Sequence, residues 1–152
     1  MDAISFYHKE NDNGYLSNLF DAPIIFEGDT WPTSEHLYQA MKHQDLSVIA
    51  KIKRQKKALH SKFVSRKACK RLDCWPSDEH KVLSMRKAIK AKFDQHPILK
   101  DKLIKTAPLS IIENSPRDHY WGVGEDDSGK NMMGVLLMEL REHYLTATDA
   151  KE

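Results

Sequence analysis

The chain has 152 residues, with 24 Lys and Arg against 22 Asp and Glu, so its formal net charge is only +2. Its length and its 40% content of hydrophobic residues suit one folded core, and its longest apolar run, near residues 135–138, is too short to cross a bilayer, which excludes a membrane-spanning protein. The charge is unevenly distributed, because residues 42–105 hold 19 basic and 6 acidic residues, a net charge of +13 that predicts a basic surface.

In the first half of the chain, short strands are expected near residues 4–7 and 23–26, the second running into a turn at Gly28. Thr33 is expected to cap a helix that continues to about residue 44, because apolar residues follow it at helical spacing. Residues 46–71 have a helical and strongly basic pattern.

The second half is expected to hold three more helices and one strand. A helix opened by Pro76 ends before Pro97, a short helix covers residues 97–103, and a strand covers residues 109–113. A glycine-containing loop precedes the last helix, which Asn131 caps. The pattern predicts one helix-rich α+β domain with a few short strands over residues 1–146, followed by a flexible tail at 147–152.

Cys69 and Cys74 are the only cysteines, and their spacing matches neither a zinc site nor a disulfide framework. We therefore expect free thiols in a reducing compartment, the cytoplasm, or the nucleus of a eukaryotic cell. The N-terminus shows no signal peptide pattern. The eight scattered histidines give no metal-ligand spacing, so neither a metal nor a cofactor is expected.

A first candidate for chemistry is Glu35, which falls in the first turn of the helix that Thr33 caps. A helix N-terminus favours negative charge, so Glu35 is expected to be ionised and to act as an electrostatic stabiliser or a general base. The alternative is that Glu35 only complements the helix dipole.

A second candidate is the segment 115–124, where Asp118, two aromatic rings, a histidine and two glycines crowd into one loop. The alternative is structural, with Asp118 capping a turn and Trp121 buried. The loop from Gly122 into the last helix is also a weak candidate for a phosphate cradle, although three acidic residues in it oppose an anion.

The basic residues 42–105 form a candidate phosphate-binding surface, because such a patch gains affinity for nucleic acid by releasing counterions. A solvated helical surface is the alternative. Trp75, near the middle of this segment, either stacks on a base or anchors the following helix.

Six blocks of the sequence match a known pattern in order and at compatible spacing. They read FY at 6–7, LSNLF at 16–20, WPTSEHLYQAMK at 31–42, MRKAIKAKFDQHP at 85–97, ENSPRDHYWGVG at 113–124 and GKNMMGVLLMELR at 129–141. Through these blocks the chain resembles the NADAR, or YbiA-like, family over almost its whole length. The resemblance implies an α+β fold and an N-glycosidase, an enzyme that hydrolyses the bond between ribose and a base or amine.

The resemblance also implies the site. Its motifs place catalytic roles on Glu35, Asp118, Trp75 and Lys92. The substrate-binding residues within or next to the matching blocks are Asn18, Trp31, Ser34, Tyr120, Trp121, Gly122, Gly124 and Asn131. The implied substrates carry ADP-ribose or a ribosyl phosphate: ADP-ribose attached to guanine in nucleic acid, which the basic segment favours, or early ribosylated intermediates of riboflavin synthesis.

Our mechanistic hypothesis gives Glu35 the task of stabilising an oxocarbenium-like state or deprotonating water, with Asp118 positioning the ribose or the water. Trp75 or Trp121 stacks on the leaving base, and Lys92 alternatively attacks the opened sugar as an amine. A non-catalytic reader of ADP-ribose or nucleic acid is a rival, and a metal-dependent nuclease is a weaker one. We expect a monomer.

Overall fold

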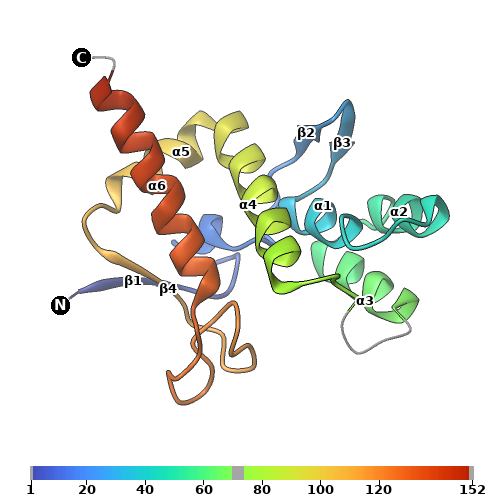
Figure 1. Ribbon diagram of the computed structural model, residues 1–152. Coiled ribbons are helices and arrows are strands. Elements are labelled where there is room, and N and C mark those ends of the chain that lie inside the picture. Colours follow the sequence, from blue (N-terminus) through green and yellow to red (C-terminus); the bar gives the residue numbers. More distant parts are fainter. Residues whose placement is uncertain (1, 70–73, 151–152) are drawn as a thin grey trace. The chain divides into compact units, whose positions relative to one another are not determined.

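The computed structural model describes residues 2–69 and 74–150. Within these ranges the chain forms six α-helices, one short 3-10 helix and four short strands (Figure 1). This arrangement confirms the helix-rich α+β class expected from the sequence. The internal contacts of the chain divide it into two compact units, Met1–Ser17 together with Pro97–Glu152, and Asn18–His96. A single domain over residues 1–146 stays a prediction.

The first unit is built on a two-stranded parallel sheet. Strand β1 (Ala3–Phe6) pairs with β4 (Ser110–Glu113), and helix α6 (Met132–Ala150) packs on β4. Helix α5 (Pro97–Lys105) packs in turn on α6, as Figure 1 shows, and η1 (Gly14–Leu16) follows β1. The buried residues of α6 are those of the expected stripe: Met133, Leu136, Leu137, Leu140 and Tyr144.

The second unit begins with a β-hairpin. Strands β2 (Ile24–Phe26) and β3 (Asp29–Trp31) pair antiparallel through a two-residue turn. Both turn residues, Glu27 and Gly28, have positive φ angles of 50° and 83°. A turn of this kind matches the right-handed twist of the strands that it joins, so the hairpin closes tightly.

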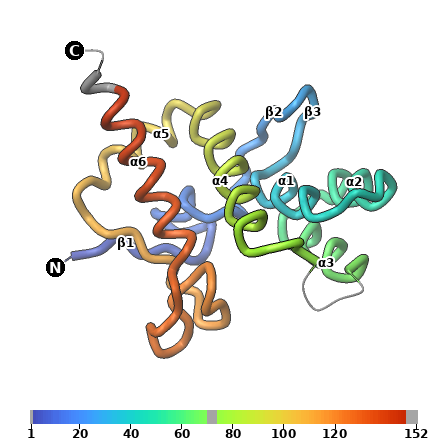
Figure 2. Tube along the Cα trace, in the orientation of Figure 1, coloured from blue at the N-terminus to red at the C-terminus, as the bar shows by residue number. Residues whose placement is uncertain are grey.

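Helix α1 (Ser34–Ala40) is the centre of the second unit, and every one of its residues is buried. It packs on α2 (Leu46–Lys53), α3 (Ala58–Ala68) and α4 (Asp78–Gln95). Figure 2 shows α1 with α4 on one side and α2 and α3 on the other. Any group that α1 carries is therefore held in a low-dielectric environment.

Several expected boundaries differ from the structure. The basic stretch after residue 46, whose internal boundaries the sequence left open, forms two helices, α2 and α3. Helix α4 is capped by Ser77, whose side chain accepts a hydrogen bond from the His80 amide at 3.1 Å, so Pro76 lies before the cap and not at the first helical position. Helix α6 continues past residue 147, the expected start of the tail, to Ala150.

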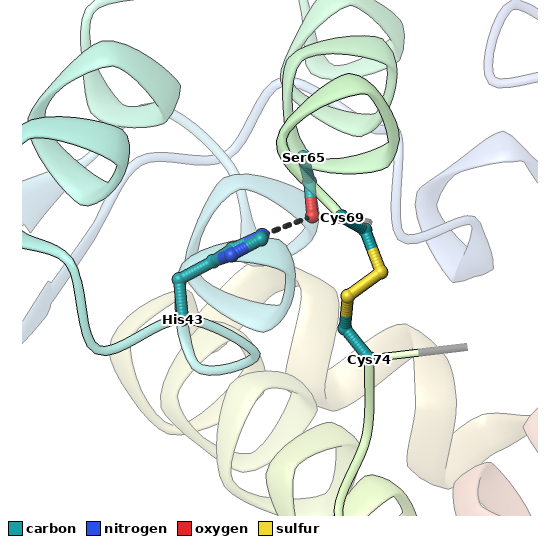
Figure 3. The surroundings of a disulfide bond; sticks show 4 residues. All are labelled: His43, Ser65, Cys69 and Cys74. Atoms are coloured by element: carbon teal, nitrogen blue, oxygen red, sulfur yellow. Dashed lines mark hydrogen bonds between the residues drawn. A yellow bond between two sulfur atoms is a disulfide. The ribbon is translucent and has the colours of Figure 1, made fainter. Parts of the chain in front are cut away.

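The expectation of free thiols is wrong, because Cys69 and Cys74 form a disulfide (Figure 3). Their Cα atoms lie 5.8 Å apart, within the range that a disulfide requires, although the sequence spacing alone did not indicate this approach. Beside the disulfide, the His43 ring and the Ser65 hydroxyl form a hydrogen bond of 2.7 Å that ties α3 to the segment after α1. In the described part of the chain, no helix has both the length and the apolar character needed to cross a bilayer.

Candidate active site

The carboxyl group of Glu35 is held by two amides. Asn18 Nδ2 donates to Glu35 Oε2 at 2.7 Å, and Gln39 Nε2 donates to Glu35 Oε1 at 2.7 Å. Asn18 is fixed in turn by α1, since the Ser34 hydroxyl donates to its side-chain oxygen and the Glu35 amide donates to its carbonyl. Thr33 caps the helix as expected, accepting from the His36 amide. Asn18 and Ser34, both expected at the site, therefore orient Glu35.

Burial raises the pKa of Glu35, whose residue is only 7% exposed. The hydrogen bonds from Gln39 and Asn18 and the charges of Lys62 and Lys42 lower this pKa, but the loss of hydration is the larger effect. The helix N-terminus predicted a carboxyl group whose pKa is not raised; that direction is wrong, because burial is the larger effect. A carboxyl group with a raised pKa suits proton donation as well as proton removal.

Lys92 is buried on α4, with only 1% of the residue exposed. Burial lowers its pKa to about 7, and its Nζ lies 5.5 Å from the ring centre of Phe20 and 5.1 Å from that of Phe93. Phe20 follows Asn18 by two residues, so one short segment contacts both Lys92 and Glu35. A lysine with a pKa near neutrality has a large neutral fraction at physiological pH, and the neutral amine is a nucleophile.

Trp75 is half-buried and packs on α1. Its ring centre lies 5.0 Å from that of Tyr38 and 5.6 Å from that of His80. Lys42 Nζ lies 5.8 Å from the Trp75 ring centre, and the charge of the same lysine lowers the pKa of Glu35. Trp75 therefore borders the surroundings of Glu35, while its ring also anchors the start of α4.

Trp31 ends β3 and is buried, with Lys53 Nζ 5.4 Å from its ring centre. Among the described residues, Trp31 Nε1 and Gln39 Oε1 are buried side-chain atoms without a hydrogen-bond partner. A buried polar atom that lacks a partner destabilises a fold by roughly 1–3 kcal/mol. Both atoms are therefore candidates for contacts with a bound ligand.

The other expected site residues gather in the loop before α6, in the first unit. Asp118 Oδ1 accepts from the amides of Tyr120 at 3.0 Å and Trp121 at 2.8 Å, so this carboxylate caps a turn. The rings of Tyr120 and Trp121 meet edge to face at 4.9 Å, and Lys130 Nζ lies 5.5 Å from the Tyr120 ring centre. The structure therefore shows the alternative in which Asp118 caps a turn, and the catalytic role of Asp118 stays a prediction.

Gly122, Gly124 and Asn131 shape this loop. Gly124 has a φ of 74°, and a Cβ on it would lie 2.3 Å from the His119 ring. Asn131 precedes α6 as expected, but its side chain is bonded to β4, donating to the Ile111 carbonyl and accepting from the Glu113 amide, each at 2.9 Å. A Cβ on Gly122 would lie 2.9 Å from the Glu113 carbonyl oxygen, which explains why that residue is a glycine.

The weakly indicated phosphate cradle at the start of α6 is not supported by the backbone. The Met132 amide donates to the Tyr120 carbonyl at 2.9 Å, and the Met133 amide donates to the Trp121 carbonyl at 3.0 Å. Because these two amides already donate hydrogen bonds to the loop, they do not face an anion. The described residues contain no group of three or more His, Cys, Asp and Glu side chains that is arranged to hold a metal ion.

The structure thus brings one set of expected residues together around α1 and another in the loop before α6. The first set consists of Asn18, Trp31, Ser34, Glu35, Trp75 and Lys92. The pairing of Glu35 with Asp118 stays a prediction. Sequence reasoning missed Gln39, although its position four residues after Glu35 places the two side chains on one helical face. It also missed Phe20, which no local signal singled out.

This fold is that of an established family. The chain belongs to the NADAR family, whose domain model matches residues 5–145. It is 43% identical over 140 residues to N-glycosidase YbiA of Escherichia coli (strain K12), covering 91% of this chain and 86% of that protein. A solved NMR structure of E. coli YbiA superposes with a TM-score of 0.85 at 41% identity, covering 96% of this chain and 86% of that one. The resemblance inferred from the six blocks is confirmed.

A more distant relative has a different name. The chain is 34% identical over 141 residues to Riboflavin biosynthesis protein VVA0006 of Vibrio vulnificus (strain YJ016). The match covers 91% of this chain but only 38% of that longer protein. The family therefore includes both stand-alone proteins and domains of larger ones.

Proposed function

We propose that this chain is an N-glycosidase that hydrolyses the bond between ribose and a nucleobase, and that its substrate is ADP-ribose attached to guanine in nucleic acid. The enzyme class is supported by membership of the NADAR family and by relatives named N-glycosidase. The observation that carries the chemistry is the buried carboxyl group of Glu35, whose pKa burial raises and whose two oxygens accept hydrogen bonds from Asn18 and Gln39.

The reaction breaks the C1–N bond of the ribose, and the base leaves with the bonding electron pair. Glu35 in its acid form supplies a proton that allows the base to leave, and its carboxylate then stabilises the positive charge at C1. Water adds to C1 and returns a proton to Glu35, so protons and electrons balance. Asn18 and Gln39 keep the carboxyl group in position through both steps.

Lys92 offers a second route. The C1–O bond of the ring breaks and the ring oxygen takes up a proton, after which the neutral amine adds to C1. The base departs with a proton as the carbon–nitrogen double bond to Lys92 forms, and water then hydrolyses this bond, releasing the sugar and restoring the amine. The two routes differ in a trapping experiment, because borohydride reduces a lysine-bound intermediate to a stable adduct. A covalent adduct at Lys92 supports the second route, and its absence during turnover supports the first.

The choice of substrate rests on charge. Residues 46–68, which include α2 and α3, contain eight Lys and Arg and no Asp or Glu, and the charges of Lys42 and Lys62 reach Glu35. A polyanionic substrate is attracted to such a surface, whereas a small nucleotide requires only one or two cations. The second candidate is hydrolysis of ribosylated riboflavin intermediates, favoured by the name of the Vibrio relative.

A side-by-side turnover assay tests the proposal. The purified chain is given ADP-ribosylated oligonucleotide and a ribosylated riboflavin intermediate, and the released base or amine is quantified by chromatography. Glu35→Gln should abolish release, while Glu142→Gln, an exposed change on α6 with the same loss of charge, should leave it unchanged. Turnover of the riboflavin intermediate alone overturns the substrate assignment. Binding of the oligonucleotide without release of ADP-ribose indicates a non-catalytic reader.

Three other expectations stay predictions: the monomeric state, the location in the cytoplasm or nucleus, and the direct contact of Trp121 with the substrate.

A further inference from the structure

A groove of about 510 Å³ lies between α2 and α3, and none of the residues assigned to chemistry lines it. Val48 and Lys51 line it from α2, and Phe63, Val64 and Lys67 line it from α3. Phe63 is 49% exposed, a large fraction for an aromatic side chain. The groove thus combines an apolar floor with a cation on each helix.

The charge around this groove has one sign. The two helices and the turn between them carry eight Lys and Arg, and among these cations Lys53 is paired with Asp29 at 2.7 Å. Lys51 and Lys67 are exposed at the groove itself. A polyanion complements the positive charge of this surface, and a flat ring can stack on its exposed aromatic side chain.

The outer face of α3 connects the groove with the surroundings of Glu35. Successive helical residues are about 100° apart, so Lys62, Arg66, Phe63 and Lys67 follow one another around the exposed side of α3, opposite the buried Ser61. Lys62 is the lysine of α3 whose charge lowers the pKa of Glu35. A strand lying across α3 from the groove therefore runs toward Lys62, on a helix that packs against α1.

We propose that the α2–α3 groove binds a single-stranded nucleic acid, with a base on Phe63 and phosphates at Lys51 and Lys67, and that the strand continues across α3 toward Glu35. A single strand fits better than a duplex because its bases are free to stack on an aromatic ring, whereas a duplex presents mainly phosphates. The direction toward Glu35 rests on the proposed function. Binding of the strand in the groove does not depend on the proposed function, because binding requires no reaction.

The first test measures binding of a fluorescent oligonucleotide without ADP-ribose, by anisotropy over a series of salt concentrations. Each phosphate contact on a single strand contributes roughly 0.7 to the slope of log K against log salt concentration, so the double variant Lys51→Gln/Lys67→Gln should lower that slope by about 1.4. The control Lys87→Gln/Lys90→Gln removes two exposed lysines of α4 and should leave the slope near that of the wild type. Equal slopes for the two double variants overturn the proposal.

The second test addresses the base. Phe63→Ala should weaken oligonucleotide binding about tenfold, since a stacked base is lost, while binding of an abasic strand should be unchanged. The exposed Leu59, also on α3, provides the control, because Leu59→Ala removes apolar surface outside the groove. If an acidic peptide of equal charge competes as well as the oligonucleotide, the groove binds a protein partner instead and the proposal fails.

Turnover of a short substrate separates this inference from the proposed function. ADP-ribosylated guanosine has no neighbouring nucleotides to occupy the groove, so the groove variants should cleave it like the wild type while cleaving the long oligonucleotide more slowly. Strand binding without any cleavage refutes the proposed function and leaves the groove assignment standing. Cleavage of the short substrate without strand binding refutes the groove assignment alone.

Discussion

Replacing Lys92 with Met should stabilise the folded chain, most strongly at low pH, and abolish a reaction that uses its amine. Burial lowers the pKa of Lys92 to about 7, whereas an exposed lysine in the unfolded chain has a value of 10.5. Between these values the unfolded state binds the extra proton, so the stability of the wild type rises with pH from about 7 to about 10.5. Below pH 7 the folded state must also hold a buried charge.

The magnitude follows from the same two values. At 1.36 kcal/mol for each pKa unit, the ionisation of Lys92 lowers the free energy of unfolding by roughly 5 kcal/mol at pH 6 and roughly 2 kcal/mol at pH 9. Met has a similar stem and no charge, so Lys92→Met should recover a large part of this energy, and its advantage should shrink as the pH rises.

The assay is urea denaturation of the wild type and Lys92→Met at pH 6, 7.5 and 9. The control Lys87→Met, an exposed position on α4, should show a small difference that does not depend on pH. If Lys92→Met is less stable than the wild type at pH 6, or if its advantage is the same at pH 6 and pH 9, burial does not lower the pKa of this amine.

Two further predictions concern α1. Gln39→Leu removes a hydrogen bond that lowers the pKa of Glu35. The limb of the kcat/KM against pH profile that is due to Glu35 should therefore move to higher pH. A limb that stays in place contradicts the assigned hydrogen bond. Thr33→Ala removes the cap of α1 and should lower the free energy of unfolding by about 1 kcal/mol, which chemical denaturation measures. Thr33→Ser keeps the hydroxyl group and should lower the free energy of unfolding much less.

Local signals in the sequence predicted most of the elements and part of the site. The cap at Thr33 and the apolar stripe of α6 are encoded by neighbouring residues, and both are present. The parallel pairing of β1 with β4 joins segments that are far apart in the chain, and no local pattern specifies such a partner. The position of the boundary between α2 and α3 was not predicted, because Gln55, Lys56 and Lys57 fit a helix as well as a turn.

The electrostatics of the site depended on tertiary packing. The helix position of Glu35 predicted a readily ionised carboxylate, but α2, α3 and α4 surround α1, and the resulting burial raises the pKa of Glu35. The neutral amine of Lys92 was expected only if the lysine were buried, and the structure supplies that condition. The disulfide was missed because spacing along the chain does not report the distance between two Cα atoms.

The complete burial of α1 has a consequence for how this protein can diversify. Each α1 side chain is packed against a neighbour, so a change there alters the fold before it alters the substrate. The exposed faces of α2 and α3 carry no such constraint, and substitutions there change charge and shape at little expense of stability. Substitutions on these outer helices can therefore change the surface charge of this unit while the buried Glu35 carboxyl group and its amide partners stay in place.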